Sequence, residues 1–216
     1  LKLWLDELKE IVELEPGHLS CYGLTLEPGT PLSIACLGEK SALPPLPSDD
    51  ECAKMFIYGS EFLESRGYLH YEISNFARMG FSCHHNLGYW EGKEYLGLGP
   101  SATSTMQSRR WTNPEDLGAY ARQVESGTLG LEKEELTQTI KVKELVMLRL
   151  RTTRGLRLKA YEELTGEDFM KTHKPMIHAM HKHELIRISK GYMRLTKNGM
   201  LVANTILENL LPEDPF

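Results

Sequence analysis

Apolar residues recur every three or four positions over residues 1–14, and this spacing predicts an amphipathic helix. Leu5, Leu8 and Val12 fall on one face, and charged residues fill most of the other. The next run, residues 18–26 (HLSCYGLTL), is apolar and aromatic without polar alternation, which predicts a strand covered on both faces. A helix followed by a buried strand is the unit of a parallel α/β fold.

A second helix and strand follow a loop that is rich in Pro and Gly. Ser48 and Glu51 have the spacing of a capping box, so we expect a helix over residues 49–66. The following segment alternates, with Leu69, Tyr71 and Ile73 on one side and polar residues between them, which predicts a strand. After a long loop, a third strand is expected within residues 95–104 (YLGLGPSATS), running into a glycine turn. Asn113 is expected to cap a helix that ends at Gly127.

The pattern changes at Thr137 to helices joined by short turns. A two-residue Lys190-Gly191 connection between the short runs IRIS and YMRL predicts a β-hairpin. Helices before and after this hairpin give the order of a winged-helix-like domain. These helices are expected over residues 140–152, 158–164, 168–184 and 196–211.

Composition is typical of a globular chain: of 216 residues, 41% are hydrophobic and 25% are charged. No apolar run reaches the roughly 18 residues that a membrane-spanning helix needs, so we expect a cytoplasmic protein. Residues 1–136 hold 11 Lys and Arg against 21 Asp and Glu, and the remainder holds 14 against 9. This charge asymmetry favours two domains. The chain starts at Leu1 inside a predicted helix, so we expect it to be a fragment.

Four cysteines are spread over the chain at Cys21, Cys36, Cys52 and Cys83, without a closely spaced pair. Without an export signal, such cysteines are mostly reduced thiols that pack as small apolar residues. The spacing predicts neither disulfides nor a zinc site.

The densest group of chemically capable side chains lies in residues 71–90 (YEISNFARMGFSCHHNLGYW). Polar groups after the carboxyl ends of strands are common positions for α/β sites, and a loop of about twenty residues without regular structure is often functional. The alternative is that these side chains only satisfy backbone groups of the loop.

Three strings in fixed order, YEISNFAR, HNLGYW and YLGLGPSA, resemble the oxygen-independent coproporphyrinogen III oxidase-like radical-SAM proteins. The upstream string HLSCYGLTLEPGTPL fits the same family, as do ELVMLRLRTTRGL and RLTKNGMLVANTIL in the tail. The resemblance covers nearly the whole chain. The HNxxYW motif is associated with the haem chaperone branch and is not found in the true oxidases.

The resemblance implies a haem site at the HNLGYW string. His85 is the candidate axial ligand, because a neutral imidazole nitrogen is a common donor to haem iron. Asn86 belongs to the same candidate site, and Tyr89 and Trp90 are expected to stack against the macrocycle. The alternative reading makes His85 a hydrogen-bonded loop residue and Trp90 a core residue. The alternative function is that of the oxidase, which converts two propionates of a porphyrinogen to vinyl groups.

The family binds a [4Fe-4S] cluster and S-adenosyl-L-methionine (SAM), and its cluster cysteines precede the segment with which this chain opens. The chain alone is therefore expected to bind no cluster and to perform no radical chemistry. By the resemblance, Thr25 and Thr103 fall near the SAM molecule. The favoured alternative is that both are ordinary residues at strand ends.

Two other functions are considered for the tail and disfavoured. His178, His181 and His183 do not share one helical face, so a metal site is not expected. The helix that carries them occupies the place of a DNA-recognition helix, but Pro175 interrupts it and its apolar residues are typical of a core, so no nucleic-acid partner is expected.

The expected architecture is the later part of a (β/α) barrel over residues 1–112, a helical linker over 113–136, and a winged-helix-like domain over 137–216. Strands missing from a barrel leave a sheet edge to be covered. A second copy of the chain, the missing N-terminal half held as a separate piece, or rearranged strands would each cover it. The haem acceptor is not specified by the sequence.

Overall fold

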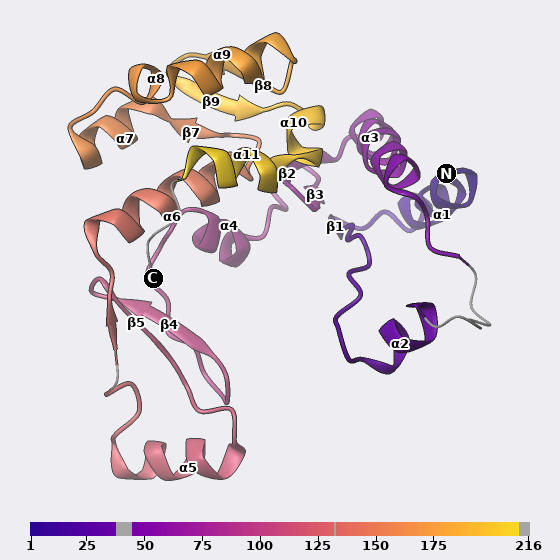
Figure 1. Cartoon of the computed structure of the whole chain (residues 1–216). Helices are drawn as coiled ribbons and strands as arrows, with labels where there is room; N and C mark the ends of the chain where they lie inside the picture. Colours follow the sequence, from indigo (N-terminus) through magenta and orange to yellow (C-terminus); the bar gives the residue numbers. More distant parts are fainter. Residues whose placement is uncertain (38–44, 132, 212–216) are drawn as a thin grey trace.

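A computed structural model describes residues 1–37, 45–131 and 133–211 as a mixed α/β structure (Figure 1). The helices are α1 (Lys2–Glu13), α2 (Pro31–Leu37), α3 (Asp49–Ser65), α4 (His84–Trp90), α5 (Leu117–Ser126), α6 (Gln138–Leu150), α7 (Leu158–Thr165), α8 (Phe169–Thr172), α9 (Lys174–Lys182), α10 (Lys197–Leu201) and α11 (Ala203–Leu210). The strands are β1 (His18–Ser20), β2 (Leu69–Glu72), β3 (Asn75–Ala77), β4 (Thr103–Met106), β5 (Arg109–Thr112), β6 (Glu134–Glu135), β7 (Leu156–Arg157), β8 (Ile186–Ser189) and β9 (Tyr192–Leu195).

The described strands form three small sheets, with orders β1-β3-β2, β4-β5-β6 and β7-β9-β8. Every strand pair in them is antiparallel, so the expectation of parallel pairing is wrong for these segments. The reason is β3, which follows β2 after a two-residue turn and pairs with both β1 and β2. β1 and β2 therefore run in the same direction, but β3 lies between them.

Two predicted strands are shorter or later than their sequence patterns indicated. The apolar run of residues 18–26 is a strand only at His18–Ser20, and Tyr22 beyond it is 73% exposed rather than covered. In the run of residues 95–104, Tyr95 forms only an isolated bridge, and the regular strand β4 begins at Thr103. β4 pairs with β5 in a hairpin that the sequence pattern did not predict.

The predicted helix boundaries hold where local capping determines them. The side-chain oxygen of Ser48 accepts from the Glu51 amide, which confirms the capping box of α3. Gly127 has the left-handed conformation expected at the end of α5, but α5 begins after Asp116, and Asn113 does not cap it. The helix predicted over residues 168–184 divides at His173, because Pro175 occupies the first turn of a new helix.

The last predicted helix, over residues 196–211, also divides. Thr196 caps α10, which ends at Leu201, and α11 starts at Ala203 after the single residue Val202. The hairpin of β8 and β9 is confirmed, with Lys190 and Gly191 both at positive φ as a two-residue connection requires.

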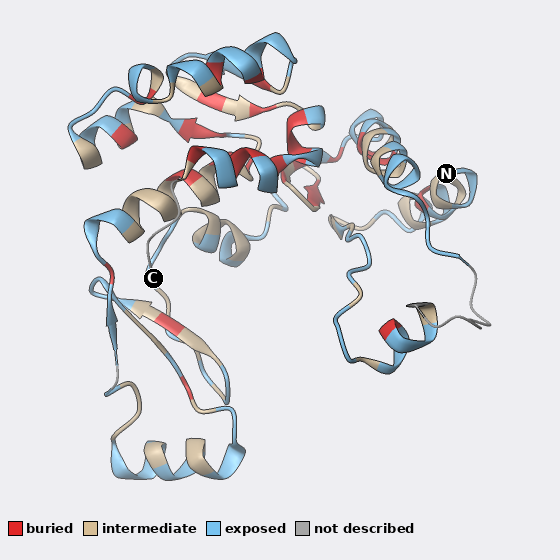
Figure 2. Ribbon diagram, in the orientation of Figure 1, coloured by how far each residue is buried: buried red, intermediate tan, exposed pale blue. Residues whose placement is uncertain are grey.

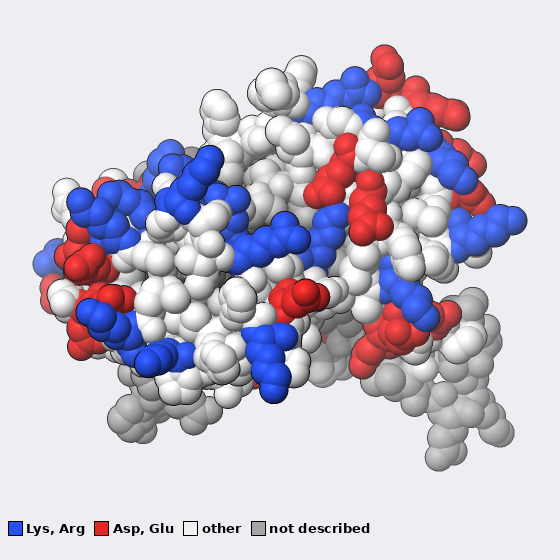
Figure 3. All heavy atoms as spheres, turned by 90° about the horizontal axis from the view of Figure 1, so that it is seen from above, with Lys and Arg blue, Asp and Glu red and all other residues white. Residues whose placement is uncertain are grey.

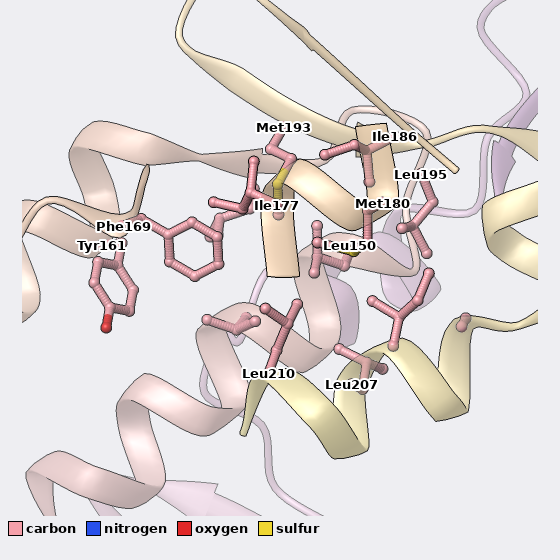
Figure 4. Close-up of a cluster of buried hydrophobic side chains, with 14 of the residues drawn as sticks. Leu150, Tyr161, Phe169, Ile177, Met180, Ile186, Met193, Leu195, Leu207 and Leu210 are labelled. Carbon is pink, nitrogen blue, oxygen red and sulfur yellow. The ribbon is translucent and has the colours of Figure 1, made fainter. Parts of the chain in front are cut away.

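Buried apolar side chains gather in two clusters. The larger one lies among α6–α11 and the β7-β9-β8 sheet (Figure 4) and includes Leu150, Phe169 and Met193, each at most 1% exposed. Full burial of a side chain of this size contributes about 1.5–3 kcal/mol. The smaller cluster joins α1, α3 and the first sheet through Leu8, Leu63 and Phe76. Buried residues are sparse on α2 and α5, which extend away from these cores (Figure 2).

His70 of β2 is buried between these two clusters, and its ring stacks on Phe76 at 4.3 Å between centroids. Burial lowers the pKa of His70 below its usual value of 6.5. The unfolded chain then binds more protons than the folded chain at acidic pH, so the free energy of unfolding should fall as pH drops through about 6.5. Urea unfolding of wild type and His70→Gln at about pH 7.5 and 5.5 should show a smaller decrease for the variant.

The pKa of His173 is also lowered by burial, so the decrease should become smaller in His70→Gln without vanishing. The exposed His178 provides the control, since His178→Gln should retain the full wild-type decrease. An equal decrease in wild type and His70→Gln would contradict the assignment to His70.

Within the described segments, no helix is long and apolar enough to cross a membrane.

Candidate functional site

The HNLGYW string forms the short helix α4 rather than part of a long loop, which corrects the sequence expectation. Cys83 precedes it as the N-cap, and its Sγ accepts from the backbone N–H of Asn86 at 3.5 Å. In a helix, residues four positions apart share a face. The spacing of the motif therefore makes two pairs: His85 with Tyr89, which we call the outer pair, and Asn86 with Trp90, which we call the inner pair.

The outer pair faces away from the body of the protein. Both side chains are exposed, and the rings of His85 and Tyr89 meet edge to face with centroids 4.7 Å apart. Tyr89 in turn contacts the ring of Tyr95 at 4.6 Å. Among the residues that the structure describes, none makes a hydrogen bond to the His85 ring. An exposed imidazole with free nitrogen atoms can act as a ligand to a metal centre that arrives from outside.

The inner pair attaches α4 to the rest of the protein. The side-chain amide of Asn86 donates to the Tyr71 hydroxyl and to the Glu72 carboxylate, each at 3.3 Å. Trp90 lines a cavity of about 280 Å³ against α6, together with Leu145 and Arg149. Trp90 thus faces α6, and among the described residues its ring makes no contact with the rings of His85 and Tyr89.

Glu72 is the centre of a buried polar network, with only 1% of its surface exposed. Its carboxylate accepts from the side-chain amides of Asn75 and Asn86 and from the backbone N–H of Ser74. Ser20 of β1 donates to Asn75, so the network joins the three strands of the first sheet to α4. Several donors around one carboxylate offset much of the cost of burying it.

A second set of contacts ties the same site to the end of α6. Glu72 forms a β-bridge with Thr152, and the backbone N–H of Thr153 donates to the Tyr71 carbonyl at 3.2 Å. The guanidinium of Arg149 donates to the Glu91 carbonyl at the end of α4, at 3.2 Å. Burial lowers the pKa of Arg149, although a guanidinium stays protonated. The orientation of α4 therefore depends on the C-terminal helices as well as on the first sheet.

The glycine turn after Tyr95 is fixed by a buried asparagine. The side-chain amide of Asn113, which is 3% exposed, donates to the carbonyls of Gly97 and Gly99 at 3.2 and 2.8 Å. A Cβ atom at Gly97 would lie 2.2 Å from the Thr103 carbonyl oxygen, so only glycine fits this approach. The sequence pattern predicts a helix cap at Asn113, and its actual role is to hold this turn.

The two candidate SAM residues are far from each other. Thr25 is exposed in the irregular segment between β1 and α2, and Thr103 bonds Thr112 across the β4–β5 hairpin at 2.9 Å. These segments lie on opposite sides of the molecule (Figure 1). The structure gives no contact that joins them in one site.

The cysteines of the chain do not fit a [4Fe-4S] cluster. All four are free thiols on separate segments, and burial raises the pKa of Cys21 to about 11, which makes it a poor thiolate ligand. Among the described residues, no three His, Cys, Asp or Glu side chains are grouped as a metal site would require. His178 and His181 on α9 and His183 just after it are exposed and belong to no such group.

The surface over α9 carries both signs of charge. Figure 3 shows Lys and Arg interspersed with Asp and Glu on this face. Met180 and Ile177 of the same helix are buried in the larger core cluster, as their apolar pattern predicted. A phosphate backbone is bound by a continuous basic surface, which this face does not offer.

Large apolar side chains are exposed in the segments that precede and follow α4 in the sequence. Met79 and Phe81 precede the helix and are 83% and 61% exposed, and Leu96 and Leu98 follow it at 58% and 80%.

Comparison with known proteins finds matches to the same family that the sequence strings resemble. The family described as HemN C-terminal domain matches residues 136–202. Heme chaperone HemW of Lactococcus lactis is 27% identical over 209 residues, covering 97% of this chain and 54% of that protein. Heme chaperone HemW of Haemophilus influenzae is 29% identical over 215 residues, covering 97% of this chain and 53% of that protein.

A solved structure has the same fold. Coproporphyrinogen III oxidase (HemN) from Escherichia coli, described as a radical SAM enzyme, matches 94% of this chain and 50% of its own with a TM-score of 0.68 and 21% identity. The chain spans about half the length of the relatives that it matches. Residues 136–202 thus match the HemN C-terminal domain family, and the chain as a whole is similar to part of the heme chaperone HemW proteins and shares its fold with part of HemN.

Proposed function

We propose that the chain is the haem-binding part of a haem chaperone and that His85 is the axial ligand to the haem iron. The single observation that carries this proposal is the outer pair: an exposed imidazole supported by the edge of the Tyr89 ring on a well-anchored helix. Two relatives that match nearly the whole chain are themselves described as heme chaperones.

The residues around the outer pair fit a flat, largely apolar ring. When bound, haem supplies an iron with an open axial position, which a neutral imidazole nitrogen can fill. Tyr89 would hold the His85 ring in orientation, and Tyr95, whose ring contacts that of Tyr89, would offer a further aromatic surface to the porphyrin. An exposed site of this kind suits a protein that must also release its cargo.

For the complete protein we propose the radical-SAM features of the family. A [4Fe-4S] cluster and SAM would be bound by residues outside this chain, with Thr25 and Thr103 as the family's candidate contacts to SAM. Residues 1–112 would form a barrel together with the N-terminal half of the complete protein. Residues 113–136 would form a helical linker between this barrel and a winged-helix-like domain of residues 137–216. The order β7-β9-β8, with α6 before β7, α7–α9 before β8 and a hairpin between β8 and β9, supports the last assignment.

Haem titration of the purified protein tests the proposal. We expect a shifted and saturable Soret band with a stoichiometry of one haem per chain. A band identical to that of free haem would reject haem binding. The oxidase function predicts instead a vinyl product from coproporphyrinogen under anaerobic conditions with SAM and a reductant, and its formation without haem binding would favour that alternative.

A further inference from the structure

The helix that carries His85 is held by a carboxylate that itself points away from solvent. Glu72 is at the end of β2, and the Asn86 amide that it accepts from is the residue next to His85 in sequence. The Tyr71 hydroxyl accepts from the same amide, and the His18 Nε2 atom lies 2.8 Å from that hydroxyl. One amide group thus connects α4 to two neighbouring residues of β2 and, through them, to β1.

We propose that Glu72, Tyr71 and Asn86 form a positioning network that sets the orientation of His85 toward its ligand. The proposal rests on the proposed function, because it concerns the same site, and it assigns Asn86 a different role from the haem contact expected from sequence. Asn86 is on the inner face of α4, about 100° around the helix from His85, so its amide is committed to the protein rather than to a ligand.

The chemistry of the network favours one orientation of α4. The Glu72 carboxylate can only accept, and the Asn86 amide nitrogen donates to it, so turning the amide over would bring two oxygen atoms together. Burial raises the pKa of Tyr71, which keeps its hydroxyl neutral. The seven-residue helix is too short to hold its position by its own hydrogen bonds. Side-chain anchors must therefore supply the precision that a metal-binding imidazole requires.

Two single substitutions and their combination test the network. Asn86→Asp places a second carboxylate beside Glu72, and Glu72→Gln removes the acceptor charge. Groups that orient a metal ligand typically change affinity by about 10–100-fold when they are removed, so we expect each variant to bind haem at least about tenfold more weakly. We also expect a Soret maximum displaced from that of wild type, because the geometry at iron would change.

The double variant Glu72→Gln/Asn86→Asp reverses donor and acceptor between the two positions. The amide introduced at position 72 can then donate to the carboxylate introduced at position 86, provided that the Asn75 amide turns over so that its oxygen accepts from the new amide and its nitrogen donates to the Ser20 hydroxyl. We therefore expect the double variant to regain part of the affinity and the wild-type Soret position. A role limited to folding would lower the free energy of urea unfolding without changing the spectrum of the haem-bound form. Tyr58→Phe, a change at an exposed tyrosine on α3, is the control and should alter neither property.

The possible outcomes separate this inference from the proposed function. If wild type binds haem, His85→Ala does not, and both single variants match wild type in affinity and spectrum, the positioning network is refuted while the haem site stands. If wild type itself binds no haem, the proposed function fails. Weaker binding in both single variants without recovery in the double variant would refute the donor–acceptor pairing of Glu72 and Asn86.

Discussion

Replacing His85 by Ala is expected to abolish the haem-dependent Soret shift and to weaken haem binding by about 100-fold or more. Loss of groups that merely orient a metal ligand costs about 10–100-fold, so loss of the ligand itself should reach at least the upper end of that range. The side chain is exposed and its described contact is to the Tyr89 ring, so the free energy of unfolding should change by less than about 0.5 kcal/mol. Absorbance titration and urea unfolding measure the two effects.

The adjacent residue supplies a matched control. His84 is also an exposed histidine on α4, but it lies outside the outer pair, so His84→Ala should bind haem as wild type does. Added free imidazole should restore an imidazole-ligated spectrum to His85→Ala, since it can occupy the vacated axial position. Wild-type affinity in His85→Ala, or equal losses in both variants, would exclude His85 as the specific ligand.

The alternating pattern of the β2 segment predicts its secondary structure but not which of its faces is buried. Its period-two alternation correctly predicts a strand, but the buried face is the opposite one: Leu69 is 53% exposed, whereas His70 and Glu72 are 8% and 1% exposed. An apolar residue usually marks the inner face, but here stacking on Phe76 and the amide donors around Glu72 make the polar set the buried one. These partners come from β3 and α4, and no local pattern of β2 contains them.

The α4 segment escapes sequence-based prediction for a related reason. A helix of seven residues has too few turns for a clear apolar period, and its polar residues give it the composition of a loop. The signal that could have identified it is the spacing of HNxxYW, in which His85 and Tyr89, and likewise Asn86 and Trp90, are four residues apart. That spacing predicts two faces of one helix and separates the exposed residues from the anchoring ones.

Elements with local determinants are predicted more accurately than elements that depend on distant strands. The capping box at Ser48 and the two-residue turn at Lys190-Gly191 each fix a boundary within a few residues of sequence. The pairing of β1 with β3 joins His18 to Ala77 and depends on how the chain returns after β2. Strand pairing of this range requires knowledge of the tertiary fold, which periodicity does not contain.

Gly155→Ala is expected to lower the free energy of unfolding by about 3 kcal/mol or more. Gly155 has φ +79°, a left-handed conformation that costs a residue with a Cβ atom about 1–2 kcal/mol. Its Cβ would also lie 2.2 Å from the carbonyl oxygen of Met193, a backbone atom of β9 beside which β7 begins. Relief of that contact requires the β7–β9 pair to separate within the larger core cluster, and this adds to the conformational cost.

Gly166→Ala separates the two contributions. Gly166 has φ +76°, nearly the same conformation, but a Cβ atom there meets nothing within 4 Å, so its loss should be limited to about 1–2 kcal/mol. The difference between the two variants in urea unfolding then measures the cost of the contact with Met193 alone. Equal losses would mean that β7 shifts freely away from β9. A freely shifting β7 would mean that its sheet does not fix the end of α6. Thr152 and Thr153, which follow α6, contact β2, so the position of Glu72 would then not depend on that sheet.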